Sequence, residues 1–142
     1  MSWTTQTLLD AMYELDAITS GEVTVSLVGD CLAATMHEQG DLPVVISISE
    51  DQMLMESVLF PVAVVKDKVA LNDEFLRNHK YLPLSTVAIE TINGEDHYVL
   101  FGALSATSTI ENVMLELTSL ADNVLTVAEA CEDQIARHPA AE

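Results

Sequence analysis

The sequence predicts an α+β fold, with an antiparallel sheet of about six strands flanked by an N-terminal helix, a short middle helix and a long C-terminal helix. Two observations support this prediction. Short segments in which apolar and polar residues alternate are joined by tight-turn pairs, as is typical of antiparallel strands. Helical apolar spacing occurs at the two ends of the chain and once between the strands, which favours helices gathered on one face of the sheet.

The first half of the chain is expected to hold one helix and four strands. Residues 4–18 keep Leu8, Met12 and Leu15 on one apolar face, and Gly21 follows as a stop signal. Four strands are then predicted, separated by turn residues: EVTVSLV (22–28), CLAATMHE (31–38), VVISIS (44–49) and QMLMESVLFPVAVV (52–65).

A short helix and a hairpin are expected next. Residues 70–82 have apolar side chains at helical spacing, with Asn72 or Asp73 as the cap and Pro83 closing the helix. The two segments of the hairpin are STVAIETI (85–92) and HYVLFGAL (97–104). Between them lies Asn-Gly, the pair best suited to a two-residue loop that needs positive φ.

The last predicted element is a helix from Ser108 to about Arg137. Ser108 and Glu111 have the spacing of a capping box. Such a helix is ~40 Å long, which is more than one sheet face of this size needs, so its apolar stripe is expected to reach a second copy in a homodimer. The stripe consists of Ile110, Val113, Leu117, Leu120, Val124, Ala128, Cys131 and Ile135.

Charge is the strongest compositional signal. The net charge is −18, residues 1–65 contain no Lys or Arg, and only the segment 66–80 is slightly basic. Such a surface repels nucleic-acid phosphate and anionic lipid, so nucleic-acid binding is not expected. Protein partners with basic or apolar surfaces are predicted instead. The alternative is that the acids only keep an apolar protein in solution.

Length and cysteine usage indicate one domain in a reducing compartment. The chain of 142 residues is expected to form a single α+β domain over residues 1–138, with 139–142 as a disordered tail. No apolar run is long enough to insert in a membrane, and no signal core precedes the domain, so a cytoplasmic location is predicted. Cys31 and Cys131 are expected to be free thiols.

Histidine, glycine and serine residues lack the sequence spacing that metal, phosphate-binding and nucleophile sites require. No metal site and no cofactor is predicted, because the histidines lack ligand spacing and the glycines form no phosphate loop. The histidines are His37, His79, His97 and His138. Ser105 lies in Gly-Ala-Leu-Ser-Ala, which is not the nucleophile-elbow motif, and only His138 follows it. No catalytic residue is therefore assigned.

Two glutamates are the reason that an enzymatic function is kept as an alternative. Glu56 and Glu90 fall inside otherwise apolar strands. If both point to the same face, they could form a pair with a raised pKa that works with His37 or His97. A deep polar pocket joining them to a histidine would favour the enzyme, and an open apolar groove would favour a binding module.

Candidate protein contacts are predicted on one strand and on the last helix. Methionines and large apolar residues suit adaptable contact surfaces, although the methionines fit a core equally well. The candidates are Met53, Leu54, Met55 and Phe60 on the strand, and Leu117, Leu120, Val124 and Leu125 on the helix.

Three motifs resemble the YjfI-like family of small bacterial proteins. They are HKYLPLST at 79–86, FGALSATS at 101–108 and LADNVL at 120–125. The resemblance covers about half of the chain in these motifs and most of it in element order. It implies a partner resembling phage-shock protein A, a membrane-stress protein.

The order of elements also resembles that of the acidic chaperones of type III secretion, which are dimeric and wrap unfolded clients. This resemblance is architectural and carries no motif. It implies a cytoplasmic, non-enzymatic protein-binding module that uses apolar surface flanked by acidic charge. The alternatives are a regulatory partner of a protein like phage-shock protein A, and an enzyme that depends on carboxylates and histidine.

Overall fold

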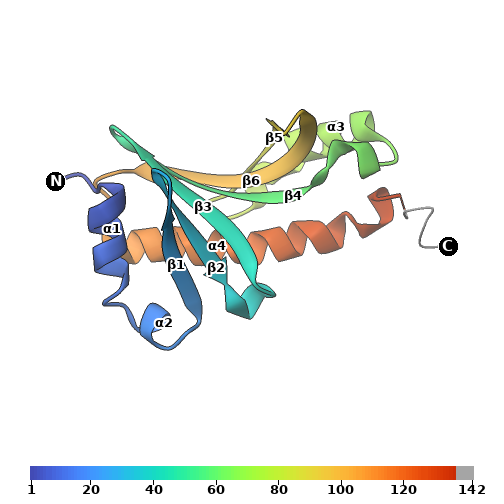
Figure 1. The fold of residues 1–142 in the computed structure, drawn as a ribbon. Coiled ribbons are helices and arrows are strands. Elements are labelled where there is room, and N and C mark those ends of the chain that lie inside the picture. Colours follow the sequence, from blue (N-terminus) through green and yellow to red (C-terminus); the bar gives the residue numbers. More distant parts are fainter. Residues whose placement is uncertain (137–142) are drawn as a thin grey trace.

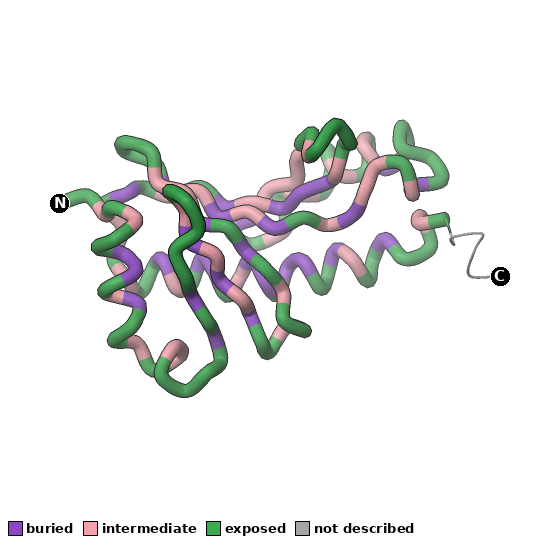
Figure 2. Tube along the Cα trace, in the orientation of Figure 1, coloured by how far each residue is buried: buried purple, intermediate pink, exposed green. Residues whose placement is uncertain are grey.

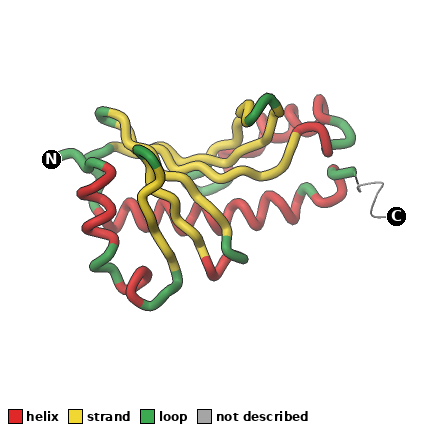
Figure 3. Tube along the Cα trace, viewed as in Figure 1, coloured by secondary structure: helices red, strands yellow, loops and turns green. Residues whose placement is uncertain are grey.

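A six-stranded antiparallel sheet is the centre of the molecule, in a computed structural model that describes residues 1–136. Its spatial order is β1-β2-β3-β4-β6-β5, so β1 and β5 are the edges (Figures 1 and 3). The strands are β1 (Val23–Val28), β2 (Cys31–Met36), β3 (Leu42–Ser49), β4 (Gln52–Pro61), β5 (Thr86–Ile92) and β6 (Glu95–Ser105). The predicted end of the domain at 138, the tail and His138 lie outside the described residues.

Within residues 1–136, four α-helices accompany the sheet, and the predicted α+β class is confirmed. They are α1 (Thr5–Met12), α2 (Asp16–Thr19), α3 (Lys68–Asn78) and α4 (Ile110–Ala130). α4 packs along β4 and β6, and α1 packs on β1 and β2 (Figure 1). No described helix is long and apolar enough to cross a membrane.

The N-terminal helix is interrupted, where one helix over 4–18 was expected. α1 ends at Met12, and Leu15 adopts extended backbone before α2 begins. Leu8 and Met12 are buried in the core, and Leu15 and Ile18 pack against the same core after the break. The change of direction therefore lets both apolar groups reach one core, which periodicity alone does not reveal.

Tight turns join the strands where the sequence predicts them. Asn93 and Gly94 both have positive φ, 51° and 79°, as a two-residue hairpin loop requires. Val28 pairs with Cys31, which leaves Gly29 and Asp30 as the loop between β1 and β2. These hairpins fix the register of the sheet.

The short helix α3 begins earlier than expected. Its cap is Asp67, whose carboxylate accepts a hydrogen bond from the Ala70 N–H at 3.1 Å, so neither Asn72 nor Asp73 caps it. Asn72 instead accepts a hydrogen bond from the Tyr98 hydroxyl. The helix ends at Asn78, before the predicted end at 82.

The C-terminal helix is shorter than expected. Thr109, not Ser108, is the cap, and its hydroxyl accepts a hydrogen bond from the Asn112 N–H at 3.1 Å. With 21 residues the helix is ~31 Å long rather than ~40 Å. Beyond it the chain turns back, and Ile135 forms an antiparallel bridge with Val65. The overhang that suggested a helix-mediated dimer is therefore not present in the described chain, and the homodimer stays a prediction.

The sheet has one covered face and one open face. Side chains alternate along a strand, so Met53, Met55 and Ser57 of β4 face α4, while Leu54 and Glu56 face the other way. The core lies between the sheet and the helices, as the buried segments of α4 and the strands show in Figure 2. The opposite face is left to solvent by the described helices.

Candidate protein-binding surfaces

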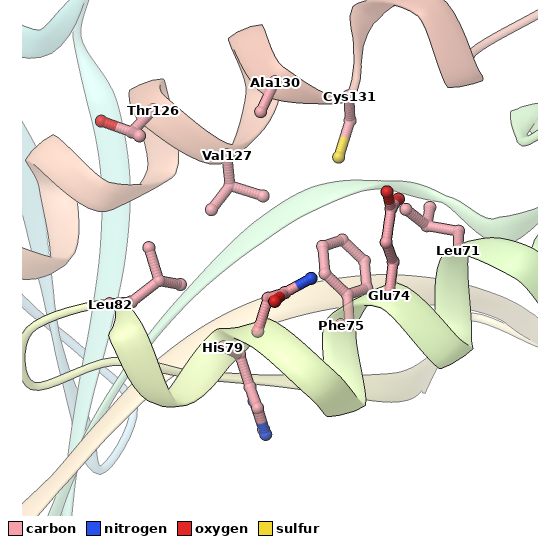
Figure 4. Close-up of a pocket in the computed structure, with 10 residues that line it drawn as sticks. Leu71, Glu74, Phe75, His79, Leu82, Thr126, Val127, Ala130 and Cys131 are labelled. Atoms are coloured by element: carbon pink, nitrogen blue, oxygen red, sulfur yellow. The ribbon is translucent and has the colours of Figure 1, made fainter.

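An open apolar groove of about 260 Å³ lies between α3 and α4. In Figure 4, Leu71, Glu74 and Phe75 of α3 point toward Val127 of α4 and toward Cys131, which follows the end of α4. Its lining residues are Leu71, Glu74, Phe75, Asn78, His79, Leu82, Thr126, Val127, Ala130 and Cys131. Carbon-rich side chains from two helices thus surround a space that nothing in the described chain fills.

The groove exists because α3 is anchored to the sheet rather than to α4. Leu71 is buried, and Phe75 packs edge-to-face on Tyr98 of β6 with ring centroids 5.4 Å apart. Outside this anchor α3 exposes Val69 and Leu76, which are 73% and 77% accessible. Neither residue lines the groove, but Leu76 lines a separate depression that shares Phe75, so α3 carries more apolar surface than its core contacts use, as is typical of surfaces that bind another molecule.

The titratable groups in the groove are poorly suited to catalysis. His79 turns its ring away from α4 (Figure 4), and its Nδ1 accepts a hydrogen bond from the Val87 N–H at 3.1 Å. Burial, together with the nearby charge of Glu74, raises the pKa of the Cys131 thiol. A protonated thiol is a weak nucleophile, so Cys131 contributes apolar surface. Cys31 and Cys131 are both free, as predicted.

The open sheet face carries the acidic pair that the sequence singled out. Glu56 lies opposite Phe101, Ala88 opposite Val99, and Glu90 opposite His97, so both glutamates are on the same face. They line a depression of about 180 Å³. Its other lining residues are Leu54, Ala88, Ile89, Val99 and Phe101.

The carboxyl of Glu56 has a strongly raised pKa. Burial is the largest cause, and the hydrogen bond and charge of Glu90 add to it, which raises the pKa of Glu56 to about 7. No described histidine lines the depression. His97, the register partner of Glu90, has its Nδ1 3.0 Å from the Glu95 carbonyl. Glu56 and Glu90 therefore form a pair without the histidine that an acid/base site was expected to include.

His37 lies elsewhere in the fold. Its ring nitrogens contact the Thr24 hydroxyl and the Asp41 carboxylate, each at 2.6 Å. Among residues 1–136, no group of three or more His, Cys, Asp and Glu side chains is placed to hold a metal ion. Ser105 contacts the Thr107 hydroxyl at 2.7 Å and accepts a hydrogen bond from the Thr107 N–H, which is turn chemistry.

A second unusual carboxyl lies on the covered face. Glu116 of α4 is 5% exposed, and its Oε2 has no hydrogen-bond partner among the described residues. Burial raises its pKa. The carboxyl occupies the space above Gly102 of β6, where the Cβ of any larger residue would collide with Oε2. Gly102 thus leaves room for the acid.

Most of the predicted contact residues belong to the core. A buried side chain offers no surface to a partner while the fold stays closed, so six of the eight candidates are corrected to core positions: Met53, Met55, Phe60, Leu117, Leu120 and Val124. Leu54 is half-buried on the open face, and Leu125 is 46% exposed on α4. Packing of α4 on its own sheet uses the stripe that was expected to contact a partner.

The groove residues were missed, although part of their signal is in the sequence. Leu71 and Phe75 gave the apolar spacing of the predicted short helix, and Cys131 belonged to the predicted stripe of the last helix. Neither pattern predicts that the two helices are separated by an open groove. The groove is a consequence of their tertiary placement.

Residues 2–135 match the family model described as "Uncharacterized protein conserved in bacteria (DUF2170)". The chain is also 35% identical over 133 residues to the protein YjfI of Escherichia coli K12, covering 94% of this chain and 98% of the relative. The same identity and coverage relate it to YjfI of Escherichia coli O157:H7. The chain belongs to the DUF2170 family, and the predicted likeness to YjfI is confirmed.

Two solved structures share its fold. A chain from the crystal structure of the ExsC–ExsE complex has a TM-score of 0.55 at 12% identity, with 91% of this chain and 96% of that chain covered. The structure of YbjN, a putative transcription regulator from Escherichia coli, has a TM-score of 0.60 at 13% identity, with 92% and 90% covered. The expected chaperone-like α+β architecture is confirmed.

Proposed function

We propose that this DUF2170 protein is a cytoplasmic, non-enzymatic protein-binding module and that the groove between α3 and α4 receives its partner. The open apolar groove is the observation that supports this function. Phe75 and Leu82 on one side and Ala130 on the other offer accessible carbon surface to an apolar side chain, while Leu71, Val127 and Cys131 of the lining are buried. Removing such surface from water drives association.

The chemistry of the two depressions favours binding over catalysis. An acid/base site needs a proton donor or acceptor within reach of a held substrate. The depression at Glu56 and Glu90 is shallow, with about 180 Å³, and no described histidine lines it. In the groove, His79 is engaged with a backbone N–H and Cys131 has a raised pKa. The likeness to a chain from a two-protein complex also supports binding.

The net charge limits the class of partner. A protein of charge −18 repels acidic partners and steers basic ones toward it. A protein resembling phage-shock protein A, implied by the family resemblance, is the first partner to test.

A single substitution at the lip of the groove tests the proposal. Ala130 is exposed and lines the groove, so Ala130→Arg fills it without disturbing the core. Capture from lysate of the native cells, followed by binding of the purified partner, should show at least about a tenfold loss of affinity, because one buried apolar contact is worth about 1.4 kcal/mol or more.

Thr118→Arg is the matched control. Thr118 is exposed on the same helix and lies outside the groove lining, so this variant adds the same charge and bulk elsewhere. It should keep wild-type affinity. If Ala130→Arg and Thr118→Arg bind equally well, the groove is not the site, and if the pure chain captures no protein at all, the binding function is wrong.

A further inference from the structure

We propose that the open face of the sheet is a second docking surface, which binds an extended protein segment through a lysine or arginine that enters between Glu56 and Glu90. The inference rests on the proposed function only in taking the partner to be a protein. It adds a separate surface, on the opposite side of the sheet from α4, and the chemistry that surface recognises.

The position of the two glutamates supports this inference. Glu56 on β4 and Glu90 on β5 lie on either side of β6, the strand between β4 and β5, and face one depression. Val99, between them on β6, is fully buried although it lies on the open face. Glu56 is thus half-buried beside an apolar floor, and Glu90 is exposed at its rim.

Charge complementarity indicates the occupant. Of the described lysines and arginines, none lies in a strand, and neither Glu56 nor Glu90 takes part in an ion pair with a described residue. Two neighbouring carboxylates repel each other, the more so because Glu56 is half-buried, and an ammonium or guanidinium group between them would relieve the repulsion. The aliphatic stem of a lysine or arginine would lie on the half-buried Leu54 and Phe101, as such stems commonly do on apolar surface.

The rest of the face suits an extended segment. Val45 and Val58 are 49% and 45% exposed on this face. Val58 and Leu54 lie on either side of Glu56 along β4, and Val45 of β3 lies opposite Glu56. A segment with apolar residues at every second position would cover this strip while its lysine or arginine reaches the depression. The −18 charge of the chain makes a second copy a poor occupant, since like charges repel.

Defined peptides test the inference. The probe is an eight-residue capped peptide with valine at alternating positions and a central lysine on the valine side, compared with the same peptide carrying arginine, glutamine or glutamate instead. Fluorescence anisotropy should give the lysine and arginine peptides at least about tenfold tighter binding than the glutamine peptide, as expected for charge-assisted contacts. Backbone NMR shifts on addition of the lysine peptide should concentrate in β4, β5 and β6.

The matched variants separate recognition from net charge. Glu56→Gln combined with Glu90→Gln should remove the preference for lysine over glutamine. Glu111→Gln combined with Glu129→Gln removes the same charge from exposed positions on α4 and should keep that preference. Thermal unfolding verifies that both pairs stay folded.

Three outcomes contradict the inference. The first is that both double variants lose the preference for lysine over glutamine to the same extent. The second is that the wild type binds all the peptides with the same affinity, and the third is that it binds none of them. The same variants also distinguish this surface from the groove between α3 and α4. A partner that Ala130→Arg loses but Glu56→Gln/Glu90→Gln retains would support the proposed function and reject the second surface.

Discussion

Neighbouring residues of β4 lie in two different environments. Met53 and Met55 are completely buried beneath α4, whereas Leu54 and Val58 lie on the face that the described helices leave open. Each face also holds one carboxyl with a raised pKa: Glu116 on the covered face and Glu56 on the open face. The sheet therefore has a face that holds the fold together and a face whose apolar and acidic groups contribute little to the core.

The largest predicted effect is on the free energy of unfolding, when adjacent residues of β4 that point to opposite faces are each replaced by alanine. Met55→Ala leaves a cavity against α4 and should lower the free energy of unfolding by about 2–5 kcal/mol. Leu54→Ala removes a half-buried side chain and should cost about 1 kcal/mol or less. Urea unfolding followed by circular dichroism measures both. Equal costs would mean that something covers the open face in solution.

Gly102 and Glu116 should show how tightly the covered face is packed. Gly102→Ala places a Cβ against the buried carboxyl and should destabilise the fold by about 1–3 kcal/mol. The same change made in a Glu116→Ala background should cost clearly less, because the colliding atoms are gone. Additive costs in this double-mutant cycle would show that the two residues do not meet.

The smallest expected effect concerns Glu56 on the open face. Because its pKa is raised from 4.5 to about 7 in the folded chain, the folded state binds the proton more tightly than the unfolded state. Its contribution to stability is complete below pH 4.5 and disappears as the pH rises through about 7. Glu56→Gln should flatten the pH dependence of the unfolding free energy in that interval.

Glu90→Gln is the companion variant for Glu56. It removes a neighbouring negative charge, so the pKa of Glu56 should move from about 7 toward 4.5 in an NMR titration. An unchanged pKa would show that the two carboxyl groups are not coupled, and the geometry of the second surface would need revision.

Local patterns determined a large part of this structure. Alternating side chains and turn pairs indicated the six strands, and Asn93-Gly94 indicated the last hairpin with its two positive φ angles. Those features depend on residues close together in sequence, which is why they can be read directly. Helix ends were less certain, because several residues in each segment can act as a cap, and Asp67 and Thr109 proved to be the ones used.

Only the tertiary structure decided which apolar residues meet the chain's own core. The stripe through Leu117 and Leu120 has the same spacing whether it packs on a sheet or on a partner, since burial of either kind has the same periodicity. Likewise, the α3–α4 groove and the meeting of Glu56 with Glu90 arise from strands and helices far apart in sequence. The sequence by itself determined the strands, the three helical segments and their order. Three-dimensional packing decided where the N-terminal helix breaks and which surfaces remain free to bind.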